Sequence, residues 1–165
     1  MSFMIFSENL VIIVSQPKLL QVFEEFIMEE TFFILKPDCL ERGLVGRVLE
    51  RAEGRGLKIT RMEMRQIDRP TLEKHYADLV DKPFFPTICD FMTSGPVLIG
   101  TLAGVGAVQA WRDMLGATDP SQAQAGTIRG DFALAALPGQ AIKNIAHGSD
   151  SLESAQREVA IWFDQ

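Results

Sequence analysis

Residues 31–38 read TFFILKPD, a short apolar run followed by a basic residue and a proline. An apolar run of this length that stops at a turn signal such as Pro37-Asp38 is typical of a buried β-strand. Lys36 then lies at the end of that strand, where α/β folds expose functional side chains. The stretch therefore predicts a buried strand that presents a cation at its end.

The chain after this strand alternates helical and extended patterns. Asp68, followed by Pro70, is a helix cap with an early proline, and Asp150 with Glu153 matches a capping box. Helical patterns cover residues 45–52, 68–79, a short piece to about 92, 105–115 and 150–162, while strand patterns cover 57–64, 97–102 and 142–146; residues 116–130 are irregular. This order predicts one α/β domain, residues 28–165, with helices covering a sheet.

Residues 1–27 form an N-terminal extension whose role the sequence does not reveal. Residues 10–14 are apolar enough for a short strand, and Pro17 is placed to open an amphipathic helix that runs to Ile27. Met28 as the natural start is an alternative. The segment lacks the early positive charge and the cleavage site of a signal peptide, and no apolar run reaches the length of a membrane span.

Composition and charge limit the function classes. With 47% hydrophobic and 23% charged residues the chain is typical of a globular protein, and its net charge of −6 argues against a nucleic-acid binder. The charge still permits an anionic small ligand, provided that basic contacts gather locally. Cys39 and Cys89 lie too far apart in sequence for a zinc or disulfide motif, so we expect two buried thiols in a cytoplasmic protein.

Two features resemble functional motifs but are weak. Gly104-Val-Gly106 follows a strand and opens a helix, yet the third glycine of a dinucleotide fingerprint is replaced by Gln109. No phosphate-binding P-loop motif occurs in the sequence. His75 lies inside a predicted helix, and we interpret it as a residue of the polar face.

The other histidine, His147, is the stronger candidate for chemistry. It lies in Asn144-Ile-Ala-His-Gly-Ser-Asp150, before Gly148, where the chain can turn tightly, and before a helix N-terminus that favours anions. A neutral imidazole there can attack an incoming phosphate, with Glu158 of the following helix as a candidate partner. A solvated histidine in a capped loop is the alternative interpretation.

Basic groups near predicted loops strengthen the phosphate interpretation. Lys36, Arg112 and Arg129 together supply forked donors and a point charge of the kind that a polyphosphate needs, although each alone is equally explained as a surface cation. Thr118 lies between the two arginines. Phe84 offers a face on which a base can stack, or else belongs to the core beside Phe85. The residues themselves therefore indicate phosphate chemistry, with a phosphohistidine as one route.

Taken together, the motifs resemble the nucleoside diphosphate kinases. The match runs in order from about Met28 to Phe163, and its blocks are TFFILKPD (31–38), HY (75–76), PFFP (83–86), SGP (94–96), RDMLGATDP (112–120), GTIRGD (126–131), NIAHGSD (144–150), and then Ser154, Ala155 and Glu158. The HGSD and GTIRGD blocks are specific, and a chance match of the whole series is negligible.

The resemblance implies an α+β fold, the ferredoxin-like βαββαβ sandwich, with a four-stranded antiparallel sheet covered by helices. It also implies ping-pong transfer of the γ-phosphate of a nucleoside triphosphate, mainly ATP, to nucleoside diphosphates, which maintains the NTP and dNTP pools. By its place in the motif, His147 is the nucleophile that becomes phosphohistidine. Mg²⁺ would be held through the nucleotide phosphates and not by a protein cluster.

The other site residues also follow from their places in the motifs. Lys36, Arg112 and Arg129 would hold the phosphates, and Thr118 would add a hydroxyl donor. Asn144 would hold the ribose, with Lys36 nearby, and Phe84 would stack on the base. Glu158 would orient His147, with Tyr76 and Ser149 in support. The family forms tetramers or hexamers built from dimers, so we expect a homo-oligomer.

Three departures from the family pattern bear on these expectations. The segment at residues 130–143 is longer than the family usually has, the chain stops at Gln165 just after the last helix, and the extension before Met28 has no counterpart. There are two rival functions. A catalytically dead member of the family would be expected to lose the histidine or an arginine, and a phosphohistidine relay module would not need Phe84 and the three cations. The enzyme is favoured over both.

Overall fold

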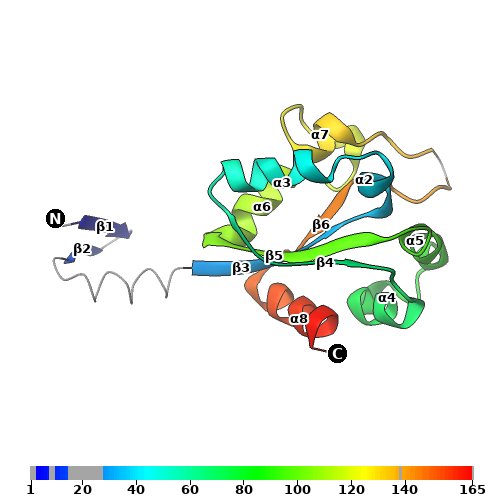
Figure 1. The fold of residues 1–165 in the computed structure, drawn as a ribbon, viewed down its shortest axis with the longest axis horizontal. Coiled ribbons are helices and arrows are strands. Elements are labelled where there is room, and N and C mark those ends of the chain that lie inside the picture. The colour runs from blue at the N-terminus through cyan, green and yellow to red at the C-terminus, as the bar shows by residue number, and fades with distance from the viewer. Residues whose placement is uncertain (1–2, 8–9, 15–27, 138, 165) are drawn as a thin grey trace.

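The computed structural model describes residues 3–7, 10–14, 28–137 and 139–164. Four of its strands form one antiparallel sheet in the order β4-β5-β3-β6, with helices on both faces (Figure 1). The strands are β3 (Met28–Leu35), β4 (Lys58–Arg65), β5 (Val97–Val105) and β6 (Ala146–Gly148). The predicted sandwich with a four-stranded antiparallel sheet is therefore confirmed.

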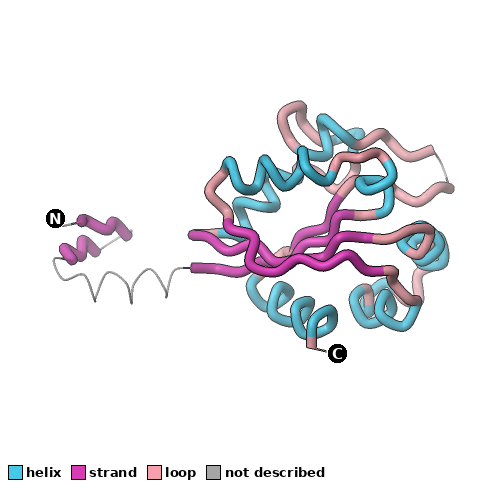
Figure 2. Tube along the Cα trace, in the orientation of Figure 1, coloured by secondary structure: helices cyan, strands magenta, loops and turns pink. Residues whose placement is uncertain are grey.

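Helices and short turns connect these strands. They are α2 (Pro37–Glu41), α3 (Val45–Gly54), α4 (Arg69–His75), η1 (Ala77–Leu79), α5 (Phe85–Met92), α6 (Ala107–Leu115), η2 (Pro120–Gln122), α7 (Ile128–Phe132) and α8 (Leu152–Phe163). In Figure 1, α3 and α6 lie on one side of the sheet and α4 and α8 on the other. The same division into helices and strands is traced in Figure 2.

Strand β3 separates two hydrophobic cores because successive side chains point to opposite faces of a strand. Phe33 and Leu35 belong to the core beneath α3 and α6, where Trp111 is fully buried. Phe32 and Ile34 belong to the core beneath α4, α5 and α8, which includes Trp162. All five residues of the predicted run 31–35 are 0% exposed. Since β3 pairs with β5 on one side and β6 on the other, its C-terminal end is fixed from both sides.

Most helix and strand predictions are confirmed, and the cap at Asp68 is among them. Its carboxylate accepts the Thr71 N–H at 3.0 Å. Both cysteines are buried free thiols, as expected. Of the two neighbouring aromatics, Phe85 is in the core and Phe84 is 52% exposed, which excludes a core role for Phe84.

Several predicted boundaries are wrong, each for a local reason. The last strand is Ala146–Gly148, not 142–146, because Ile145 has φ 73° and leaves the extended region. The last helix is capped by Ser151, whose Oγ accepts the Ser154 N–H at 3.0 Å, and not by Asp150. The helix predicted over 68–79 ends at His75 and continues as η1.

The segment 116–130 is also more ordered than predicted. It contains η2 and the start of α7, so Arg129 lies in a short helix and not in a loop. Thr127 caps α7 by accepting the Gly130 N–H at 3.1 Å. A helix of five residues is too short to show a hydrophobic period, and this explains why the sequence pattern missed both α7 and α2.

In the extension, β1 (Phe3–Ser7) and β2 (Leu10–Val14) form an antiparallel pair, which confirms the predicted strand at 10–14. The helix predicted from Pro17 to Ile27 lies outside the described residues. Among the helices that the structure does describe, none has the length and apolar character needed to cross a membrane.

Candidate active site

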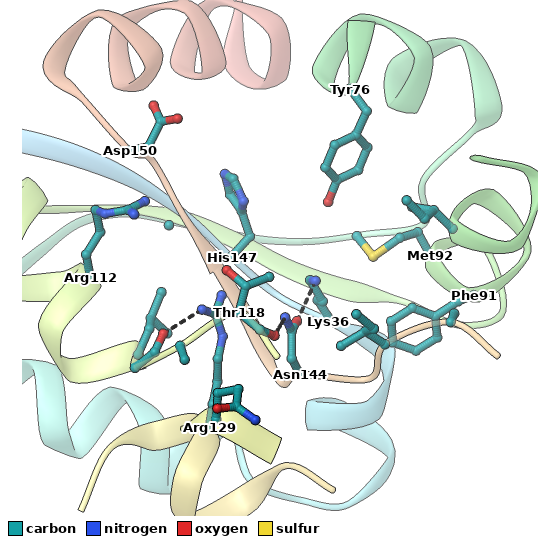
Figure 3. A pocket seen from close by; sticks show the side chains of 18 of the residues that line it. Lys36, Tyr76, Phe91, Met92, Arg112, Thr118, Arg129, Asn144, His147 and Asp150 are labelled. Carbon is teal, nitrogen blue, oxygen red and sulfur yellow. Dashed lines mark hydrogen bonds between the residues drawn. The ribbon is translucent and has the colours of Figure 1, made fainter. Parts of the chain in front are cut away.

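A pocket of about 950 Å³ opens at the C-terminal end of β3, and all predicted site residues except Ser149 line it. Its walls come from the end of β3, from β6, the α4–α5 region and α6, from the segment that leads into α7, from residues 139–144 and from α8. In Figure 3, the side chains of Lys36, Arg112 and Arg129 lie around His147, with Tyr76 on the opposite side. The fold thus brings together residues that are more than 100 positions apart in the sequence.

His147 lies in the middle of β6, paired with Ile34 of β3, and not at a turn before a helix as the sequence suggested. Gly148 does not provide the turn either, since it is not among the glycines with positive φ. A Cβ at Gly148 would collide with the Trp111 indole, so glycine is required there by close packing. The backbone of His147 is therefore fixed by sheet pairing and by a packed aromatic ring.

The His147 ring is oriented by a carboxylate on α8. Its Nε2 lies 3.0 Å from Glu158 Oε2, and Ser149 Oγ donates to the same oxygen at 2.6 Å. Ser149 in turn accepts the Phe32 N–H at 3.2 Å, which ties the carboxylate to β3. Because an ionised carboxylate has no proton to donate, Nε2 carries the proton and Nδ1 keeps its lone pair. Among the described residues, Nδ1 has no hydrogen-bond partner.

Lys36 and Asn144 form the floor of the pocket. Lys36 Nζ donates to Asn144 Oδ1 at 2.7 Å, and Asn144 Nδ2 donates to the Thr118 carbonyl at 2.8 Å. Burial and the nearby Arg129 charge lower the pKa of Lys36 to about 8. The lysine is therefore held in a defined direction and carries a charge that the surrounding groups only partly balance.

Arg129 is 8% exposed and is held by two carbonyls, of Gly116 and Ala146, each at 2.8 Å. Its pKa falls to about 10 because of burial and the neighbouring Arg112 charge. Arg112 is exposed at the rim of the pocket. Repulsion among these cations means that an anionic ligand would be stabilised here despite the negative net charge of the protein.

Tyr76 and Phe84 line the side of the pocket away from the arginines. Tyr76 follows α4, and burial raises the pKa of its phenol. Phe84, just before α5, leaves its ring exposed at the pocket wall together with Ile88 and Phe91. This apolar side of the pocket is suited to a flat ring, and the cationic side to phosphates.

His75 is not the polar-face residue that its sequence position indicated. It is 5% exposed, and its Nδ1 accepts the Trp162 indole N–H at 3.1 Å. Burial, with the nearby His147 charge as a further cause, moves the pKa of His75 well below its ordinary value. Its ring lies 4.7 Å from that of His147, edge to face. The His-Tyr pair of the motif gave no signal for this contact, because it depends on Trp162 at the other end of the domain.

In the described part of the chain, the one group of three metal-binding side chains is His75, His147 and Glu158, whose ligand atoms lie within 4.8 Å of one another. It does not fit a metal well. The Trp162 indole N–H donates to the lone pair of His75 Nδ1, so the proton of the neutral His75 ring is on Nε2. A protonated Nε2 has no free lone pair and cannot coordinate a metal while this hydrogen bond is kept. Mg²⁺ also prefers oxygen ligands to imidazole.

An imidazole with a free lone pair beside a cationic pocket can accept a phosphoryl group, and the apolar wall can accept a base. Fold and site together define a nucleotide phosphotransferase. Comparisons with known proteins agree: the family model described as nucleoside diphosphate kinase matches residues 29–165. The chain therefore belongs to the nucleoside diphosphate kinase family, whose members transfer phosphate from nucleoside triphosphates to nucleoside diphosphates.

Individual relatives are similar over nearly the same region. A nucleoside diphosphate kinase of Streptococcus thermophilus is 57% identical over 138 residues, which is 84% of this chain and 100% of the relative. A crystal structure of the enzyme from Encephalitozoon cuniculi is 39% identical, with TM-score 0.77, covering 83% of this chain and 90% of that one. The enzyme from Borrelia burgdorferi is 34% identical, with TM-score 0.79 and coverages of 84% and 88%.

Proposed function

We propose that this protein transfers the γ-phosphate of ATP, or of another nucleoside triphosphate, to nucleoside diphosphates through a phosphohistidine on His147. One observation carries the assignment of the nucleophile. Glu158 holds Nε2 of the half-buried His147 ring, and Nδ1 is left with a lone pair in a cationic pocket.

The reaction has two balanced halves. In the first, the Nδ1 lone pair attacks the γ-phosphorus, an N–P bond forms, and the bond to the β-phosphate oxygen breaks, so that a nucleoside diphosphate leaves. In the second, a β-phosphate oxygen of another diphosphate attacks the same phosphorus, and the N–P electrons return to Nδ1. Throughout, the Nε2–H group donates its hydrogen bond to Glu158, whose negative charge stabilises the positive charge that develops on the ring.

The cations supply most of the remaining stabilisation, because a phosphoryl group in transfer carries charge on its peripheral oxygens. We assign Lys36, Arg112 and Arg129 to these oxygens. Arg129 is suited to in-line geometry because two carbonyls fix its guanidinium before any ligand arrives. Tyr76 and Ser149 support His147 and Glu158 without contacting the nucleotide.

The nucleotide is held from its other end by neutral groups. Phe84 stacks on the face of the base. Stacking does not depend on hydrogen bonds to the edge of the base, so it favours tolerance of different nucleotides. We assign Asn144, which is fixed between Lys36 and the Thr118 carbonyl, to the ribose, and the Thr118 hydroxyl as a further donor. The Borrelia burgdorferi relative was solved as a transition-state mimic with bound vanadate and ADP, which supports a diphosphate and a phosphoryl group sharing the pocket.

In this proposal Mg²⁺ would enter the site bound to the nucleotide phosphates. The described pocket residues do not offer the oxygen-rich cluster that the ion would need for binding by protein alone. The ion would neutralise phosphate charge when it is bound with the substrate. Lys36 and the arginines hold the same phosphates from the protein side.

The test is labelling with γ-³²P-ATP and Mg²⁺, followed by a chase with GDP or UDP. We expect a protein label that is lost in acid, kept in base and transferred to either diphosphate. His147→Ala must remain unlabelled, although His75, the other histidine, is still present. Arg55→Ala, a change at an exposed arginine outside the pocket, should be labelled like the unchanged chain. No label on the intact chain would instead indicate a binding role.

We also propose that residues 28–165 are the kinase domain and that residues 1–27 are an extension. The protein acts in the cytoplasm. It forms a homo-oligomer, a tetramer or hexamer built from dimers. The match of the family model to residues 29–165 supports the division. The edge strand β4 supports assembly, since Met62 and Met64 on it are 54% and 65% exposed. Activity of a chain that starts at Met28, cell fractionation and the mass in solution test these three points.

A further inference from the structure

The backbone just before His147 is strained. Ile145 has φ 73°, and it is the only non-glycine residue with positive φ in the described part of the chain. The Asn144 carbonyl accepts the Ala146 N–H at 2.8 Å, which closes a three-residue γ-turn centred on Ile145. Turns of this kind with positive φ are rare, and a β-branched residue suits them least. Such a conformation persists only where its surroundings impose it.

Two residues just after β3 impose it, Lys36 and Asp38 of α2. The Lys36 N–H donates to the Ile145 carbonyl at 2.9 Å, and the Ile145 N–H donates to Asp38 Oδ2 at 3.0 Å. Asp38 is 4% exposed and Ile145 is fully buried, so water cannot replace either bond. The Ile145 side chain packs in the same core as Phe33 and Leu35, which holds the turn from its apolar side.

The strained turn lies between two groups of the proposed reaction. Asn144, directly before it, is bonded to Lys36 and Thr118, and His147 follows two residues after Ile145. A change in the turn therefore alters the direction of Asn144 and the start of β6 together. Asp38 itself does not line the pocket, so any effect that it has on the reaction passes through Ile145.

We propose that Asp38 is a positioning residue for phosphotransfer: by accepting the Ile145 N–H it maintains the γ-turn that sets Asn144 and His147 relative to Lys36. This rests on the proposed function. Without that acceptor the amide would be buried and unpaired, and relaxation of the turn would be favoured. Burial raises the pKa of Asp38, which agrees with a carboxyl group placed for hydrogen bonding in an apolar setting.

Asp38 could instead act only as a counter-charge for Lys36, and substitutions separate the two roles. Asp38 Oδ1 has no hydrogen-bond partner among the described residues. Asp38→Asn can therefore direct its amide oxygen at Ile145 and place its NH₂ where Oδ1 stands, keeping the acceptor and removing the charge.

The experiment measures kcat and KM for ATP and GDP, with the rate of phosphohistidine formation, in the full chain. Asp38→Ala should lower kcat by roughly 100-fold with a smaller change in KM, since misplacement by about 1 Å has that effect. Asp38→Asn should stay within about threefold of the unchanged protein, as expected for a retained acceptor.

Two results would overturn the proposal: wild-type kcat in Asp38→Ala, or an Asp38→Asn as impaired as Asp38→Ala. If Asp38→Ala does not fold by circular dichroism, Asp38→Asn decides, and a loss beyond about tenfold rejects the acceptor role. Labelling of the unchanged protein and of His147→Ala runs in parallel. Absence of a His147-dependent label there would refute the proposed function itself, whatever the Asp38 variants show.

Discussion

The two edge strands of the sheet, β6 and β4, differ in almost every respect. β6 has three residues, and Ala146 and Gly148 are buried on either side of His147. β4 has eight residues, of which none is buried. Polar groups from β3, α7 and α8 hold β6 and its neighbours, whereas β4 carries exposed methionines and charged side chains. A nucleophile needs a fixed position and a controlled proton, and only the enclosed edge provides both.

Among these variants, removal of the Arg129 side chain should lower the activity most. Arg129→Ala deletes a proposed phosphate ligand and also the two bonds to the Gly116 and Ala146 carbonyls, so we expect kcat/KM to fall by about 10³-fold. Steady-state kinetics with ATP and GDP measures this. Arg55→Ala is the control and should remain near wild type; equal losses in the two variants would contradict the assigned role.

Ser149→Ala should have an intermediate effect, because it frees the Glu158 carboxylate without removing it. The variant loses the donor to Glu158 and the acceptor for the Phe32 N–H. We expect kcat to fall by about 10- to 100-fold, and the free energy of unfolding by about 1–3 kcal/mol from the unpaired buried groups. Ser121→Ala, on the surface, is the control. A Ser149→Ala variant with normal kcat would mean that Glu158 needs no support.

The buried histidine predicts a pH dependence of stability. The pKa of His75 is lowered in the folded state. Below about pH 6.5, His75 is therefore protonated in the unfolded chain but stays neutral in the folded chain. The free energy of unfolding should therefore decrease as the pH falls from 7 to 5.5, by at most about 1.4 kcal/mol per pH unit from this residue. Urea unfolding of the wild type and His75→Gln measures it.

In His75→Gln the slope with pH should be shallower, because the glutamine carbonyl can still accept the Trp162 N–H but does not titrate. The carboxylates are present in both proteins, so their contributions cancel in the comparison, and the part of the His75 shift that comes from the His147 charge is removed together with His75. Identical slopes in the two proteins would show that His75 takes up its proton equally well in the folded state.

The exposed edge should affect chemistry least. Replacing both Met62 and Met64 by Lys adds charge to β4 and should shift the mass in solution towards smaller species, because like charges would face each other across a paired edge. Phosphohistidine formation should stay within about threefold, since β4 does not line the pocket. Light scattering with labelling tests both. An unchanged mass would remove β4 from the assembly proposal.

The buried run 31–35 and most of the order of helices and strands are visible in apolar spacing, because both depend on local patterns. The four-stranded antiparallel sheet followed from the family resemblance, and the residues of the motif blocks gather around one pocket. The geometry around His147 was not visible. Trp162, Trp111 and Asp38 reach the site from distant parts of the chain, and a sequence pattern does not show which buried groups meet.

The same limit explains the misplaced turn. Gly148 suggested a tight turn at the histidine, since glycine permits positive φ, but the strained residue is Ile145. Tertiary contacts from Lys36 and Asp38 override the local preference of a β-branched residue there. Where local preference and structure disagree, the position is a candidate for a functional constraint.

The most direct test of the account asks which nitrogen of His147 carries the phosphate. The bond from Glu158 to Nε2 predicts attachment at Nδ1. Phosphorylated protein, denatured in base to preserve the label, can be examined by ³¹P NMR against the two phosphohistidine isomers. A single Nδ1 resonance, absent in His147→Ala, is the expected result; phosphate on Nε2 would contradict the role assigned to Glu158 and with it the mechanism.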